Sequence, residues 1–311
     1  MSDLLAQLDV LRHGPIAVVD RSDRGHVRVT GPDALSFLQA LVSADLDALS
    51  DGEGAESLLL HPQGKLDVAF RLLRVGGEAW LDTDPGLAPQ LVASLDRFKI
   101  RVEAQVVDVT DELAMFSEVG TDPAEAPVAL HSHVAPSDLG GTRVVRTRLG
   151  VDVMGPPAAV RARRDARLAA GAVLVDADAW EAFRIEQGIP VQPVDIDDST
   201  IPQEAELELD AVSFTKGCFI GQELVCRIDS RGHVNRFLRR LTAIDGPRPA
   251  SGTEIVVDGK VVGTVTSVSP EPFPPVALGY VRREVDPPET VELQSPSGNG
   301  HARVEPLHPD A

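Results

Sequence analysis

The sequence predicts an α+β protein of three domains that ends in a small antiparallel β-barrel or sandwich. Its 311 residues exceed what one hydrophobic core usually organises. Before Arg236, short apolar alternations typical of strands are mixed with helical segments, whereas only alternating runs separated by Gly and Pro turns follow it. We therefore place the domains at 1–105, 106–236 and 237–311, with the second interleaved with the first.

The first domain is predicted to alternate strands with helices. Gly31-Pro32-Asp33 is a turn that starts the first helix, and Asp33 is a candidate to cap it. Residues 61–64 form the turn of a hairpin. The predicted strands are 26–29, 57–60, 66–73 and 79–81, and the predicted helices are 33–42 and 86–98.

The second domain is predicted to mix strands and helices, whereas the third is predicted to contain strands alone. The second has strands at 106–109 and within 144–154, and helices at 157–170 and 177–187, the last ended by Gly188-Ile189-Pro190. The strands of the third domain are predicted at 238–244, 253–257, 261–268, 276–281, 291–294 and 302–304.

Charge and composition exclude several function classes. The formal net charge of -19 repels phosphate backbones, so we expect no direct nucleic-acid partner. No stretch is apolar enough for a membrane span, and no signal peptide is visible. Two cysteines, Cys218 and Cys226, are too few for a disulfide framework, which favours a reducing compartment and a cytoplasmic location.

The segment from Lys216 to Glu223, KGCFIGQE, concentrates the unusual residues of the chain. Its glycines permit close backbone approach, and a neighbouring lysine and a following helix both favour a thiolate at Cys218. A reactive Cys218 and a small buried residue in a tight turn are about equally supported, because free cysteines are usually buried.

This segment resembles the KGCYxGQE signature of the YgfZ branch of the aminomethyltransferase (GcvT) fold family. Six of the seven fixed positions match, and Phe219 stands where tyrosine is usual. The resemblance implies a three-domain cloverleaf whose central cavity holds tetrahydrofolate or a derivative. It also implies an accessory role in assembly or repair of iron-sulfur proteins, which supports tRNA modification indirectly, with Cys218 as the important residue. The expected partners are therefore folate and iron-sulfur proteins or their assembly machinery.

Folate recognition calls for a buried carboxylate, because the pterin presents two adjacent N–H donors. Glu186 matches the position where the aminomethyltransferase branch places this carboxylate, and Glu204 is the second candidate; Glu186 could instead be an ordinary exposed acid. We expect Arg184 to brace the fold. The resemblance also assigns folate contacts to Lys216, Gly217, Phe219, Gly221, Gln222 and Arg227.

Asp67 follows the turn at 61–64 and is the second candidate for a catalytic role, beside Cys218. The related hairpin of the aminomethyltransferase branch carries paired acids, whereas here Asp67 is followed by Val68. Asp67 is thus either a ligand contact or a solvated strand residue. The alternative function, a tetrahydrofolate-dependent aminomethyltransferase or related one-carbon transferase, depends on it, and whether the protein is an enzyme stays open.

Metal binding is weakly supported. His131-Ser132-His133 lacks a third ligand, so we expect these histidines to face solvent and predict no metal site. Cys226 is expected to pack a helix.

Overall fold

The computed structural model describes residues 2–120, 126–135, 137 and 140–308. The chain divides into two compact units. We call Val10–Val175 with Glu208–Glu223 the two-sheet unit. We call Met1–Asp9, Asp176–Leu207 and Leu224–Ala311 the barrel unit. The three-domain division and the central cavity stay predictions.

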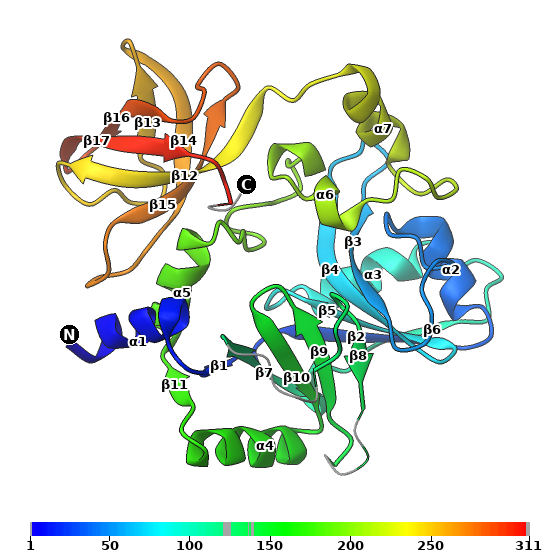
Figure 1. Cartoon of the computed structure of the whole chain (residues 1–311). Coiled ribbons are helices and arrows are strands. Elements are labelled where there is room, and N and C mark those ends of the chain that lie inside the picture. Colours follow the sequence, from blue (N-terminus) through cyan, green and yellow to red (C-terminus); the bar gives the residue numbers. More distant parts are fainter. Residues whose placement is uncertain (1, 121–125, 136, 138–139, 309–311) are drawn as a thin grey trace. The chain divides into compact units, whose positions relative to one another are not determined.

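The first sheet of the two-sheet unit has five antiparallel strands in the order β3-β4-β5-β2-β6. The strands are β2 (Gly25–Thr30), β3 (Gly54–Leu60), β4 (Leu66–Val75), β5 (Glu78–Thr83) and β6 (Gln105–Asp108), coloured blue to cyan in Figure 1. Since β6 pairs with β2, the sheet extends past the predicted boundary at residue 105.

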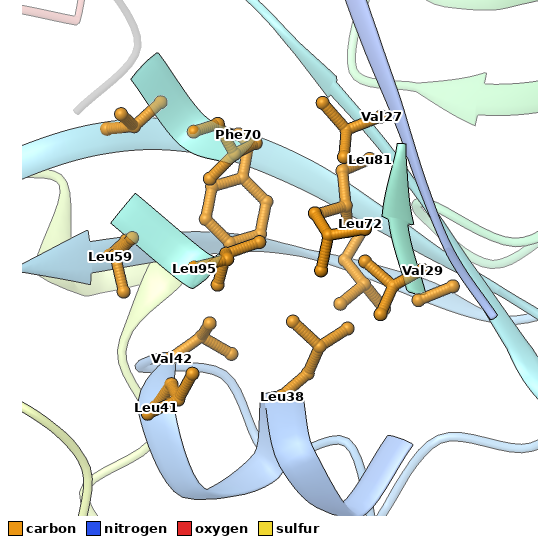
Figure 2. Close-up of a cluster of buried hydrophobic side chains, with 14 of the residues drawn as sticks. Val27, Val29, Leu38, Leu41, Val42, Leu59, Phe70, Leu72, Leu81 and Leu95 are labelled. Carbon is orange, nitrogen blue, oxygen red and sulfur yellow. The ribbon is translucent and has the colours of Figure 1, made fainter. Parts of the chain in front are cut away.

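Helices α2 (Ala34–Leu41) and α3 (Ala88–Asp96) contribute to the core that this sheet buries. Figure 2 shows Leu38 of α2 pointing toward Leu72 and Val29 of the sheet. All three are fully buried, and each contributes about 1.5–3 kcal/mol relative to an exposed side chain. The buried face of α2 therefore packs on the sheet, and the helix and the strands lie close to their predicted positions.

The second sheet of this unit has six strands in the order β11-β1-β7-β10-β9-β8. Val160 of α4 (Pro157–Ala169) packs with Val18, Phe116 and Val153 of the sheet. Only β1 and β11 run parallel; the other pairs are antiparallel. The strands are β1 (Ala17–Asp20), β7 (Ala114–Val119), β8 (His133–Val134), β9 (Arg143–Thr147), β10 (Gly150–Gly155) and β11 (Val173–Val175).

Asp33 does not cap α2, which corrects the sequence prediction. Its side chain makes no cap hydrogen bond, and Oδ2 accepts the backbone N–H of Glu103 at 2.8 Å. The acid therefore ties two loops together. The prediction also lacked α1 (Ser2–His13), β1, β7, β11, the 3-10 turn η1 (Thr110–Glu112) and α6 (Glu208–Ala211).

The barrel unit ends in a closed six-stranded antiparallel barrel in the order β12-β15-β14-β13-β16-β17. The sequence predicted a barrel or a sandwich, and the structure shows a barrel, coloured yellow to red in Figure 1. Its core includes Leu241, Ile255 and Val265. The strands are β12 (Arg236–Asp245), β13 (Glu254–Val257), β14 (Lys260–Val268), β15 (Val276–Arg282), β16 (Glu289–Ser295) and β17 (Gly298–Glu305).

Three short elements lead into the barrel: α5 (Ala177–Glu186), η2 (Pro202–Glu204) and α7 (Gln222–Arg231). Helix α5 and its end at Gly188 agree with the prediction. Gly188 has φ +68°, and a Cβ there would meet the carbonyl oxygen of Leu307, so only glycine suits the position. Within the described ranges, no helix has the length and apolar character needed to cross a membrane.

Candidate functional site

Lys216 anchors the start of the KGCFIGQE segment. Its Nζ donates hydrogen bonds to the carbonyl oxygens of Gln39, Val42 and Ala44 at 2.8, 2.7 and 2.7 Å. These carbonyls lie at the end of α2, where a cation is favoured. Burial lowers the pKa of Lys216 to about 8. The ammonium therefore fixes the segment to α2.

Gly221 anchors the far end of the same segment. It has φ +78°, and a Cβ there would lie 2.6 Å from the carbonyl oxygen of His61, so the motif backbone packs directly on the hairpin turn. Between the anchors, the Ile220 N–H donates to the Leu41 carbonyl at 3.3 Å, and Phe219 is buried. The Phe219 ring centroid lies 5.6 Å from Lys216 Nζ.

Cys218 lies between these anchors and is exposed. The alternative of a buried turn cysteine is therefore wrong. A Cβ added at the neighbouring Gly217 would meet no atom within 4 Å, so the thiol side of the segment is open. Since α7 begins only at Gln222, Cys218 precedes the helix instead of lying in its first turn. Cys226 lies within α7 and is half-buried.

Asp67 is the second residue of β4 and is only 4% exposed, so the solvated alternative is wrong. Gln90 Nε2 donates to its Oδ1 at 2.8 Å, and Arg97 lies 3.6 Å from its Oδ2. The hairpin turn that Gly221 contacts comes just before Asp67 in the chain. The two-sheet unit thus brings the motif and the hairpin of Asp67 together.

Glu186 is the last residue of α5 and is half-buried. Its carbonyl oxygen accepts Arg240 at 2.8 Å. Arg184, two residues earlier in the same helix and 3% exposed, bonds Glu181 at 2.7 Å and Asp195 at 2.8 Å. The prediction that Arg184 braces the fold is confirmed, and Glu186 therefore stands on a fixed helix.

Glu204 is buried in η2 and already engaged. Its Oε2 accepts Arg236 at 3.0 Å and the backbone N–H of Ile201 at 3.2 Å. The Arg236 guanidinium also stacks over the ring of Tyr280 at 4.2 Å. These contacts give Glu204 a role in closing η2 onto the barrel; its role in folate binding stays a prediction.

The other residues to which we assigned folate contacts differ in how exposed they are. Gln222 opens α7, and Arg227 is an exposed residue of the same helix. Gly217 is exposed, whereas Lys216, Phe219 and Gly221 are buried by the anchoring contacts. Folate contacts of all these residues stay predictions.

The expectation that both histidines face solvent is wrong. His133 is 4% exposed, with Nε2 3.0 Å from the Arg74 carbonyl and Nδ1 2.9 Å from Arg143. His131 is largely buried, and burial lowers its pKa to about 4. Across the described positions, no group of three His, Cys, Asp or Glu side chains could hold a metal ion.

Sequence reasoning missed a buried cluster of charges between the two sheets. Arg71 bonds Asp82 at 2.8 Å and Asp152 at 2.7 Å, and Arg24 bonds Asp82 at 2.9 Å. The hydroxyl of Ser117 donates to Asp152 at 2.6 Å. The available signal was Arg71, one of two charged residues in the predicted strand 66–73.

The chain is similar to several known proteins. The chain is 32% identical over 236 residues to the tRNA-modifying protein YgfZ of Edwardsiella ictaluri, covering 73% of this chain and 71% of that protein. A putative chloroplastic transferase of Arabidopsis thaliana is 26% identical over 298 residues, covering 89% and 67%. No protein-family model matches the chain.

Among solved structures, aminomethyltransferase T of the glycine cleavage system from Bartonella henselae is similar, with a TM-score of 0.84. It is 20% identical, and the match covers 98% of this chain and 88% of that one. At this identity the likeness concerns the fold alone, and it confirms the predicted α+β fold.

Proposed function

The chain belongs to the YgfZ family, and on that premise we propose that it binds tetrahydrofolate and serves as an accessory protein in the assembly or repair of iron-sulfur proteins. In this role it supports tRNA modification indirectly, as the name of its relatives suggests. The observation that carries the proposal is the motif segment, which is anchored at Lys216 and Gly221 while Cys218 stays exposed.

An anchored segment with an exposed thiol suits an accessory factor. The three hydrogen bonds of Lys216 and the tight contact of Gly221 fix the backbone on either side of Cys218. The thiol needs no opening of the fold to meet a protein partner or a reagent. Fixing the backbone also lowers the entropy lost when that partner binds.

The residues of the barrel unit fit a pterin. A carboxylate pairs with the adjacent N–H donors of the pterin edge through both oxygens, and such charge-assisted pairs are strong. Glu186 is half-buried on a helix that Arg184 braces from within, so its carboxylate is presented from a rigid element. Bound tetrahydrofolate would supply the one-carbon chemistry, while Glu186 would orient the pterin.

A second candidate is aminomethyl or related one-carbon transfer. The buried carboxylate of Asp67, held by Gln90, is the observation in its favour, because a fixed carboxylate can steer an amine. Val68 in the next position removes the second acid of the related hairpin. Turnover of one-carbon-loaded tetrahydrofolate with an amine donor would establish this second function.

Calorimetric titration with tetrahydrofolate tests the pterin anchor. We expect Glu186→Gln to weaken binding by about ten-fold or more, because the pterin N–H groups lose a charged acceptor. Asp178→Asn is the matched control: Asp178 lies exposed on the same helix, and its neutralisation should leave the affinity unchanged. Equal affinities for the wild type and Glu186→Gln would remove Glu186 from the site.

A further inference from the structure

A pocket of about 620 Å³ lies within the two-sheet unit, on side chains that no other role in the molecule uses. We call it the Trp80 pocket; Arg28, Asp51, Glu78, Trp80, His133 and Arg143 line it, with the turn at 75–77. Its volume lies in the range of small-molecule sites. Trp80 comes from β5, Arg28 from the neighbouring β2 and Arg143 from β9 of the other sheet.

Two guanidinium groups pack on the indole of Trp80. The Cζ atoms of Arg28 and Arg143 lie 5.4 and 5.1 Å from the ring centroid. Arg28 also bonds Glu78 at 2.8 Å, whereas Arg143 has no carboxylate within ion-pair distance among the residues described. The indole therefore carries Arg28, which is paired with Glu78, and Arg143, whose charge is offset at longer range by Asp51 without a direct ion pair.

His133 orients Arg143. Its Nε2 lies 3.0 Å from the Arg74 carbonyl, so Nε2 carries the proton and donates it. Nδ1 is then the acceptor for Arg143 at 2.9 Å. Burial, together with the charge of Arg143, lowers the pKa of His133 and keeps the ring neutral. A neutral, doubly bonded imidazole thus fixes the cation at the pocket wall without cancelling its charge.

The pocket also has N–H donors that lack acceptors. Trp80 Nε1 and Arg28 Nε are buried and make no hydrogen bond. Such buried donors are rare and call for an acceptor. Asp51, which also lines the pocket, does not meet this need: its Oδ1 accepts the Gly76 N–H at 2.6 Å, and neither Trp80 Nε1 nor Arg28 Nε bonds it. Because both nitrogens are shielded from solvent, an acceptor from outside the chain reaches them only if the side chains around them shift.

We propose that the Trp80 pocket binds the oxyanion group of a small metabolite, a carboxylate or a phosphate. Arg143 supplies the charge, and the N–H groups of its guanidinium that do not bond His133 donate to the anion oxygens. Guanidinium forks match both anions in geometry. None of its lining residues belongs to the barrel unit, which carries the proposed folate anchor Glu186.

Fluorescence of Trp80 provides a direct assay. The chain has two tryptophans, so Trp180→Phe leaves Trp80 as the only one. This protein is titrated separately with sodium phosphate and sodium succinate, with sodium chloride keeping the ionic strength constant. We expect a saturable change with a dissociation constant of about 1 mM or tighter. Saturation by phosphate alone or by succinate alone identifies the anion, and a response equal to that of chloride for both overturns the site.

Two variants test the residues. Arg143→Gln should weaken the anion at least about ten-fold, whereas Arg161→Gln, the same charge change at an exposed position of α4, should not alter it. Gly77→Phe places a ring at the pocket rim, where a Cβ meets no atom within 4 Å, and should block binding without disturbing the fold. Unchanged affinity in Arg143→Gln overturns the proposal; if that variant does not fold, unchanged affinity in Gly77→Phe does so.

Discussion

Two regions of the two-sheet unit use charged side chains in opposite ways. In the buried cluster, Arg71 and Asp82 are at most 4% exposed, and their charged groups bond each other and their neighbours. In the motif segment, the charge of Lys216 is likewise satisfied by backbone carbonyls, but the adjacent Cys218 is left outside. In the buried cluster, the charged side chains bond one another inside the fold. In the motif segment, the ammonium of Lys216 fixes the backbone, and the thiol of Cys218 stays exposed. A side chain whose polar groups are all bonded within the protein has a structural role, whereas the exposed Cys218 thiol can still react or bind.

The largest effect should come from the buried cluster. We expect Asp82→Asn to lower the free energy of unfolding by about 3–5 kcal/mol, because it leaves Arg71 and Arg24 buried without their shared anion. Asp96→Asn, which removes a surface pair with Lys99, should cost about 1 kcal/mol or less. Urea unfolding measures both. Similar losses in the two variants would contradict the distinction drawn between the regions.

The same cluster predicts the acid side of the stability profile. The arginine neighbours hold the pKa of Asp82 well below its ordinary value of 3.8. A depressed carboxyl pKa contributes stability that is present above the ordinary value and is lost as pH falls below it. The wild type should therefore lose stability more steeply below about pH 4 than Asp82→Asn does.

Lys216 should have the next largest effect. Lys216→Met removes three hydrogen bonds to carbonyls at the end of α2, and we expect a loss of about 1–3 kcal/mol. Cys218→Ser, two residues away but exposed, should change the unfolding free energy by about 0.5 kcal/mol or less. If both variants lose the same stability, Lys216 is not the anchor of the segment.

Local patterns predicted those parts of the fold whose two faces differ. Strands β16 and β17 of the barrel alternate between a core face and an outer face, so their period of two is visible in the sequence. Strand β7 was missed because five of its six residues are buried and no alternation remains. Strand β1 pairs with β11, more than 150 residues later, and no local pattern encodes such a partner.

The candidate site divides in the same way. The KGCFIGQE string located the segment and its cysteine from sequence alone. The lysine that it contains was read as a neighbour of the thiol, yet its three acceptors lie 172–177 residues earlier in the chain. Arg184 was correctly read as a brace, whereas His133 was not, because its partners come from the distant Arg74 and from β9.

The smallest effect in energy, and the most direct test of the motif segment, is the difference in reactivity between its Cys218 and the nearby Cys226. We expect iodoacetamide at neutral pH to alkylate Cys218 several-fold faster than Cys226, since Cys218 is exposed and Cys226 is half-buried in α7. Peptide mass spectrometry after timed quenching measures both rates in one sample. In strong denaturant the two rates should converge, which shows that the fold, not the local sequence, sets the difference. Equal rates in the native protein would mean that the motif segment does not keep the Cys218 thiol accessible. The contrast with the buried cluster would then be wrong at the residue on which the proposed function depends.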